Sequence, residues 1–166
     1  DRRCPGKCPG SSQKITSITE RIMNIYFCGA ISAGRKLLPA YRIIVNILKE
    51  YGTVLTEHVA DPNLTAGGEK KLSNREIFYR DLDWLKKADC LIAEVTTPSL
   101  GVGYEIAVGV RRNISVHALF QQKDDRRLSA LVSGNPGVTV HSYTKPEELV
   151  PLIRSIMERN ILQNKP

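Results

Sequence analysis

Short apolar runs alternate with longer segments of helical periodicity from about residue 23 to the end of the chain. The runs have the length of strands, and CLIAEV is continuous enough to be buried on both faces, as in a parallel sheet. We therefore expect strands at residues 24–28, 53–56, 90–95, 114–120 and 138–142.

Helices are expected between these strands. Apolar residues recur at helical spacing over 37–48, Gly52 is expected to end that helix, and another helix is expected over 101–112.

Two capping boxes mark the start of the remaining helices. Ser73 with Glu76 predicts the start of a helix that runs to about residue 87. Thr144 with Glu147 predicts a second box, with Pro146 in the first turn of the last helix.

The regular alternation of strand and helix predicts an α/β fold. Right-handed crossovers give a three-layer sandwich with five parallel strands in the flavodoxin-like (Rossmann-like) order 2-1-3-4-5. Such a sheet binds ligands at the carboxyl ends of its strands where the strand order reverses, between the first and third strands. The loops GAISAGR and TTPSLGVGYE follow these two strands, so we expect the functional residues there.

Composition is that of a globular protein, with 42% hydrophobic and 25% charged residues among 166. We expect one domain over 23–166, preceded by a flexible leader at 1–22 that is rich in Pro, Gly, Ser and Thr. No apolar run approaches the roughly 18 to 20 residues that span a bilayer, and no secretory signal is recognisable, so we expect neither membrane insertion nor secretion.

The net charge of +7 does not indicate nucleic-acid binding. The leader holds five basic and two acidic residues, which is +3 and leaves +4 for the rest, without a basic stripe. Cys4 and Cys8 lack a second pair at zinc spacing, so no metal is expected. Cys28 and Cys90 lie in apolar runs, which suits a reducing compartment. We expect a cytoplasmic protein, and the leader's basic residues leave nuclear entry open.

Glu105 is the first candidate for chemistry. It lies one turn into the helix that follows the third strand, between Gly101 and Gly109 at a spacing of four, which predicts open space beside the carboxylate. A helix N-terminus favours anions, so we expect the carboxylate to be ionised and able to attack carbon. The alternative is an acid that merely faces water on an amphipathic helix.

Asp81 and Tyr26 are further candidates. Asp81 shares a helix face with Ile77 and Leu85, so it is paired, protonated or functional there, or it makes a buried hydrogen bond to a loop. Tyr26 lies near the end of the first strand and points to the face opposite Phe27. A core role is the alternative for this side chain.

Other residues at the strand ends bear on binding. The candidate roles of His58 are metal ligand, titrating group and hydrogen-bond partner. The candidate roles of Ser99 are helix cap and phosphate contact. The motifs GxGxxG, GxxxxGK[ST] and GxSxG are absent, which argues against NAD chemistry, P-loop phosphoryl transfer and α/β-hydrolase chemistry. We expect a site without cofactor or metal.

Five segments in this order resemble the 2'-deoxynucleoside 5'-monophosphate N-hydrolases, relatives of the nucleoside 2-deoxyribosyltransferases: YFCGAISAGR, VLTEHVAD, RDLDWLKKAD, AEVTTPSLGVGYE and RRLSAL. The resemblance implies cleavage between nucleobase and 2-deoxyribose 5-phosphate through a glycosyl ester on Glu105. It also implies that Asp81 helps the base leave and that Tyr26 positions the nucleophile and sugar. It implies phosphate contacts from Ser99, Gly101 and, across a homodimer, Ser129.

The first loop departs from the family pattern. Vertebrate members read GSIRGGR, whereas this chain has Ala30 and Ser32 in place of the serine and first arginine, while it keeps Gly29, Ile31, Gly34 and Arg35. Ser32 is a candidate replacement contact, and Arg35 or Arg127 a candidate source of positive charge.

Three functions remain compatible with the sequence. The first is hydrolysis of deoxynucleoside monophosphates, and the second is deoxyribosyl transfer to another base from unphosphorylated deoxynucleosides. The third is a nucleotide-binding module without turnover, which the presence of Tyr26, Asp81 and Glu105 disfavours.

Overall fold

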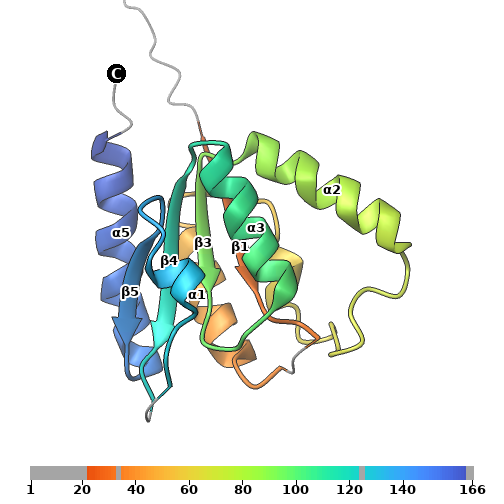
Figure 1. The fold of residues 1–166 in the computed structure, drawn as a ribbon, viewed down its shortest axis with the longest axis horizontal. Coiled ribbons are helices and arrows are strands. Elements are labelled where there is room, and N and C mark those ends of the chain that lie inside the picture. Colours follow the sequence, from red (N-terminus) through yellow and green to blue (C-terminus); the bar gives the residue numbers. More distant parts are fainter. Residues whose placement is uncertain (1–21, 33–34, 124–125, 164–166) are drawn as a thin grey trace, which may run out of the picture.

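A single five-stranded parallel sheet organises the molecule. The computed structural model describes residues 22–32, 35–123 and 126–163, so the expected leader lies outside the described residues apart from Ile22. The strand order is β2-β1-β3-β4-β5 with every pair parallel, which confirms the predicted topology (Figure 1). The strands are β1 (Met23–Gly29), β2 (Gly52–Val54), β3 (Cys90–Glu94), β4 (Ser115–Gln121) and β5 (Thr139–Tyr143).

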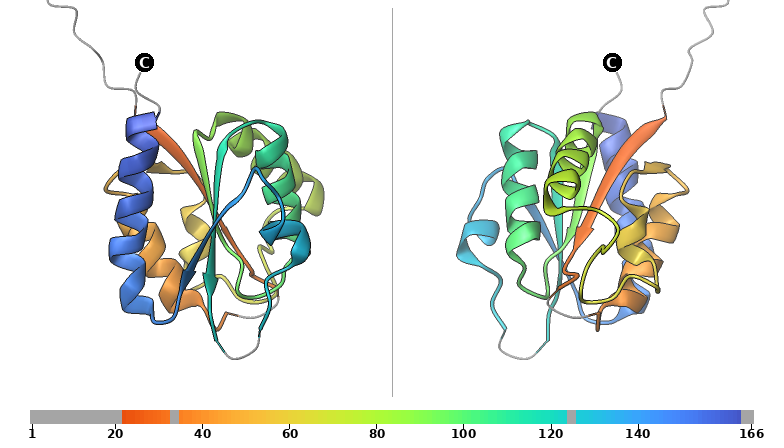
Figure 2. Two further views of the ribbon diagram at one scale, coloured as in Figure 1. Left: turned by 60° about the vertical axis from the view of Figure 1, so that its left-hand side comes forward. Right: turned by 90° about the vertical axis from the view of Figure 1, so that its right-hand side faces the viewer.

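Helices cover both faces of the sheet and complete the predicted three layers. One face carries α1 (Leu38–Leu48) and α5 (Leu149–Gln163), and the other carries α2, α3 and the short α4 (Figure 2). The bounds of these last three are Asn74–Lys87, Leu100–Arg111 and Ala130–Ser133. Two 3-10 turns, η1 (Glu57–Ala60) and η2 (Pro146–Glu148), and α4 were not expected from the sequence. No helix in the described ranges is long and apolar enough to cross a bilayer.

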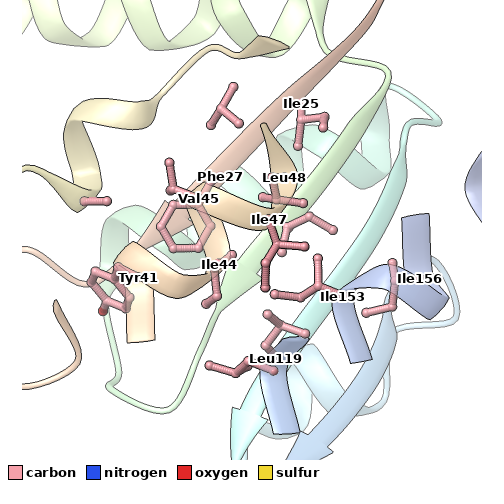
Figure 3. Close-up of a cluster of buried hydrophobic side chains, with 14 of the residues drawn as sticks. Ile25, Phe27, Tyr41, Ile44, Val45, Ile47, Leu48, Leu119, Ile153 and Ile156 are labelled. Atoms are coloured by element: carbon pink, nitrogen blue, oxygen red, sulfur yellow. The ribbon is translucent and has the colours of Figure 1, made fainter. Parts of the chain in front are cut away.

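The alternation of side chains along β1 divides the core in two. Ile25 and Phe27 pack with Ile44 and other residues of α1 and α5 (Figure 3). Tyr26 and Cys28 point to the opposite face, into the core formed with α2 and α3. The predicted orientation of Tyr26 is thus confirmed, and it brings the phenol to the face that carries Glu105.

The prediction that Gly52 ends the first helix was wrong. The helix ends at Leu48, and Gly52 instead begins β2 opposite Met23. A Cβ atom at Gly52 would lie 2.1 Å from the Met23 carbonyl oxygen, so glycine is needed for the two strands to approach. The second strand is also shorter than expected, and Thr56 beyond it bonds the backbone of Phe27 through its hydroxyl.

One of the two predicted capping boxes forms. Ser73 and Glu76 exchange the expected hydrogen bonds at the start of α2. At the other site Glu148, not Glu147, bonds the Thr144 backbone N–H (2.9 Å) and hydroxyl (2.5 Å). The prediction failed because the 3-10 turn η2 precedes the last helix, which begins only at Leu149. The Glu148 carboxylate, four residues after Thr144, therefore reaches the Thr144 backbone.

Candidate active site

A pocket of about 640 Å³ opens where β1 and β3 end, at the predicted reversal of strand order. Its walls come from the ends of these strands, η1, the loop 61–73, α2 and the start of α3. Nine of the residues selected from sequence line it: Tyr26, Gly29, Ile31, Ser32, His58, Asp81, Ser99, Gly101 and Glu105. The structure therefore brings together side chains that are far apart in the chain.

Glu105 projects from the first turns of α3 into this pocket. Ser99 caps the helix by accepting a hydrogen bond from the Val102 N–H (3.4 Å). The Tyr26 hydroxyl donates to Oε1 of Glu105 at 2.6 Å. Glu105 is therefore a half-buried group held by the sheet, not a surface acid facing water.

The expected ionisation of Glu105 needs correction. Burial raises the pKa of Glu105 to about 7, and this effect exceeds the opposing influence of the hydrogen bond from Tyr26. The nearby Asp81 carboxylate raises the pKa further. Burial also raises the pKa of Tyr26, so its hydroxyl stays protonated and remains a donor. Near neutral pH the Glu105 carboxyl is thus divided between its two forms.

The interpretation of Gly109 as open space beside Glu105 was wrong. A Cβ atom there would lie 3.0 Å from Leu91 and 3.2 Å from Val116, so this glycine lets α3 pack closely on the sheet. Gly101 does border the pocket, and the nearest atom to a Cβ there is the Ser99 hydroxyl oxygen at 3.8 Å. Space for a ligand therefore exists beside Gly101 and not at Gly109.

Asp81 lies on α2 beside Ile77, and both line the pocket. Burial raises the pKa of the Asp81 carboxyl, while the adjacent Arg80 guanidinium, 2.9 Å from Oδ1, acts in the opposite direction. Asp83 on the same helix is an exposed partner of Lys87, as expected for a surface acid. Asp81 is thus a carboxyl with a raised affinity for a proton, placed in the same pocket as Glu105.

His58 stands on η1 and faces the loop that closes the pocket. Its Nε2 is 3.2 Å from Oε1 of Glu69, and its ring lies 5.6 Å from that of Trp84. Burial lowers the pKa of His58, and Glu69 opposes this shift. The sequence offered no signal for Glu69, because it lies in a polar loop without periodicity.

Three predicted contacts do not reach the pocket within this chain. The Arg35 Nη2 donates to the carbonyl oxygens of Val59 (2.8 Å) and Asp61 (2.9 Å), so it secures η1 to the following loop. Ser129 is exposed at the start of α4, away from the pocket residues of its own subunit. Arg127 is exposed as well.

A buried carboxyl at the end of β3 was missed. Glu94 is fully buried on the α1 and α5 side of the sheet, and its Oε1 accepts hydrogen bonds from Thr96 and from the Tyr143 hydroxyl (3.0 Å). Burial raises the pKa of Glu94 to about 7. Its position inside an apolar run concealed it, because a strand buried on both faces shows no alternation.

Within the described ranges, no group of three or more His, Cys, Asp or Glu side chains is arranged to hold a metal ion. Cys4 and Cys8 lie outside the described residues.

Fold and site together define an α/β protein with two carboxyl groups and a tyrosine in one pocket at the end of a parallel sheet. The model of the nucleoside 2-deoxyribosyltransferase family matches residues 25–150, and the chain belongs to this family.

Several curated relatives are similar to the chain over most of its length. The zebrafish (Danio rerio) protein named 5-hydroxymethyl-dUMP N-hydrolase is 44% identical over 75% of this chain and 90% of its own length. The human (Homo sapiens) protein of the same name is 48% identical over 66% of this chain and 64% of its own length. The Methanosarcina mazei protein named "Putative 2'-deoxynucleoside 5'-phosphate N-hydrolase 1" is 44% identical over 85% of this chain and 88% of its own length.

Proposed function

We propose that this chain hydrolyses the N-glycosidic bond of 2'-deoxynucleoside 5'-monophosphates, which yields a free nucleobase and 2-deoxyribose 5-phosphate. The observation that carries the proposal is the 2.6 Å hydrogen bond from Tyr26 to Glu105 inside a pocket that also holds Asp81. The names of the relatives, which specify hydrolysis of deoxynucleoside 5'-phosphates, support the same reaction.

The reaction proceeds in two displacements at the anomeric carbon. The free Oε2 of Glu105 attacks C1', the bond from C1' to the base nitrogen breaks, and the base takes its proton from the Asp81 carboxyl. Water then attacks C1' of the glycosyl ester and gives a proton to the Asp81 carboxylate, while Glu105 leaves as a carboxylate. Tyr26 holds Oε1 throughout and so fixes the direction of attack. Both carboxyl groups return to their starting forms.

The 5'-phosphate is proposed to bind at the start of α3. The backbone N–H groups of the first turn and the helix dipole attract an anion there, beside Ser99 and Gly101. Ser32 from the first loop lines the same pocket and is a further hydroxyl donor. Arg35 serves this site indirectly in our proposal, by holding η1 with His58 in place.

A homodimer is proposed to complete the phosphate site with Ser129 of the second subunit. Exposed apolar side chains gather on the α2, α3 and α4 side of the sheet, namely Phe78, Tyr79, Leu100, Tyr104 and Leu131. Leu100 and Leu131 are 97% and 87% exposed, which favours a partner surface over them. Leu131 is two residues from Ser129, so a subunit contact over Leu131 would place the Ser129 hydroxyl near the phosphate site of the second subunit.

Replacing Ser129 by Ala is expected to lower kcat/KM about tenfold for a deoxynucleoside monophosphate and to leave the unphosphorylated deoxynucleoside unaffected. A hydrogen bond to a charged group is worth roughly 1.5–3 kcal/mol, and only the phosphorylated substrate has that group. Steady-state kinetics on both substrates measures this, with Ser142→Ala at an exposed position of β5 as the control. An equal loss on both substrates would remove Ser129 from the phosphate site.

Mixed dimers test whether Ser129 acts across the interface. Subunits carrying Ser129→Ala are mixed with subunits carrying Glu105→Gln. If Ser129 serves the neighbouring site, the hybrid contains one complete site and activity recovers on mixing. If it serves its own site, no complete site forms and activity stays low.

Product analysis distinguishes hydrolysis from the two other functions. The protein is incubated with deoxyguanosine monophosphate or deoxyguanosine, with and without a second free base, and the products are separated by chromatography. Free guanine with sugar phosphate is the expected result. A new nucleoside or nucleotide would instead indicate transfer, and binding without products a non-catalytic module.

We further propose that the reaction takes place in the cytoplasm or nucleus, since the buried free thiols of Cys28 and Cys90 suit a reducing compartment.

A further inference from the structure

Arg80 joins two walls of the pocket. Its Nη1 and Nη2 donate to the two carboxylate oxygens of Glu69, each at 2.6 Å, and Glu69 belongs to the loop 61–73. Its Nε donates to Oδ1 of Asp81 at 2.9 Å. One guanidinium therefore connects the loop that closes the pocket with the carboxyl proposed to protonate the leaving base.

The contact between Arg80 and Asp81 does not arise from helix geometry alone. Neighbouring residues on a helix point in different directions, so their side chains do not normally face each other. Trp84, one turn further along α2, places its ring under the guanidinium with 4.6 Å between the Arg80 Cζ and the ring centroid. The Glu69 carboxylate fixes the other edge. The guanidinium is thus held in an orientation that turns Nε towards Asp81.

We infer that Arg80 is a positioning residue, which holds Oδ1 of Asp81, leaves Oδ2 for the substrate and joins this arrangement to the loop 61–73 through Glu69. This inference rests on the proposed function for the role of Asp81, but the contacts themselves do not depend on it. The three side chains are each only 21–25% exposed, so the two ion pairs are partly shielded from solvent and from salt.

The charged groups around Asp81 determine whether loss of Arg80 raises or lowers the pKa of Asp81. Arg80 lies on the same helix, His58 comes from η1, Glu69 from the loop, Glu105 from α3 and Tyr26 from β1. Burial raises the pKa of Asp81, and Arg80 is the strongest influence that lowers it. Loss of the Arg80 charge therefore raises the pKa of Asp81 further.

Charge and shape of Arg80 have separable consequences. The loop residues Gly67, Gly68 and Glu69 line the pocket, so the paired hydrogen bonds to Glu69 affect substrate binding. A lysine keeps the charge but cannot bond both oxygens of Glu69 and reach Asp81 at once. A glutamine loses both the charge and the pairing.

The test compares Arg80→Lys, Arg80→Gln and Glu69→Gln with the wild type in the full chain. Arg80→Gln is expected to raise KM. It is also expected to raise, by about one pH unit, the pH at which kcat falls because Asp81 loses its proton. Arg80→Lys and Glu69→Gln are expected to raise KM about three- to tenfold and to move that pH less than Arg80→Gln does. The control is Lys87→Gln, which breaks an exposed ion pair with Asp83 on the same helix and should change neither quantity.

A readout without turnover separates this inference from the proposed function. The Asp81 carboxyl is titrated by ¹³C NMR in the wild type, in Arg80→Lys and in Arg80→Gln, with Asp81→Asn to assign the signal and thermal melting to confirm folding. An upward shift of the Asp81 pKa that is larger in Arg80→Gln than in Arg80→Lys supports the inference, even if no base is released by the wild type. An unchanged Asp81 titration in folded Arg80→Gln overturns it, whatever the enzyme catalyses.

Discussion

Replacing Glu105 by Gln is expected to lower kcat for base release by roughly 10⁴-fold while the fold remains intact. The amide cannot form the ester at C1', and loss of a nucleophile removes the covalent route altogether. Gln has the size of Glu, and its oxygen can still accept the hydrogen bond from Tyr26 that now measures 2.6 Å. The measurement is base release over hours by chromatography, with thermal melting as the folding control. Activity near the wild-type level would remove Glu105 from the mechanism.

The same carboxyl predicts the pH dependence of the wild type. Only the ionised form attacks, and burial raises the pKa of Glu105 to about 7, so kcat is expected to rise as pH increases through about 7. The limb should be absent from the residual rate of Glu105→Gln. Acid quenching during turnover and intact mass analysis should find the protein heavier by one deoxyribose phosphate in the wild type only.

Replacing Asp81 by Asn is expected to lower kcat by roughly 10²- to 10³-fold on natural deoxynucleoside monophosphates. The asparagine cannot give a proton to the departing base, whereas the attack of Glu105 on C1' is still possible. Substrates whose base leaves readily as an anion should therefore lose much less activity. A series of substrates with leaving groups of graded acidity measures this difference.

Asp83→Asn is the matched control for that series. Asp83 lies on the same helix, carries the same group and is bonded to Lys87 on the exposed side, so its neutralisation should leave kcat within about twofold. If Asp81→Asn slows all substrates by the same factor, Asp81 does not protonate the leaving base.

The sheet shows how far the pattern of residues determines the fold. Each predicted strand is present. The nearly continuous apolar run of β3 in particular has few alternatives to a parallel strand buried on both faces. The ends of elements were less predictable. Gly52 begins β2 because of its approach to the Met23 carbonyl, and Glu148 replaces Glu147 because of a 3-10 turn. Both outcomes depend on contacts that a local pattern does not contain.

The candidate site, too, was predicted from the sequence only in part. Glu105 and Tyr26 were identified from their positions near a helix start and a strand end, and Asp81 from its place on an apolar helix face. The structure places all three in one pocket. The connection between Glu69 and Arg80 joins an irregular loop to a helix 11 residues later, and neither residue stands out in the sequence. Such pairs are decided by how a loop folds back on the sheet.

The amino-acid sequence by itself determined the strand order, the edge of the sheet where ligands bind and the carboxyl groups available for chemistry. Only the tertiary structure decided the protonation and the partners of these side chains. It determined the pKa of about 7 for Glu105, the hydrogen bond from Tyr26 to Glu105 and the hydrogen bond from Arg35 to the Val59 carbonyl oxygen. The physical reason is that periodicity is local, whereas desolvation and hydrogen bonding depend on groups that the chain brings together from distant positions.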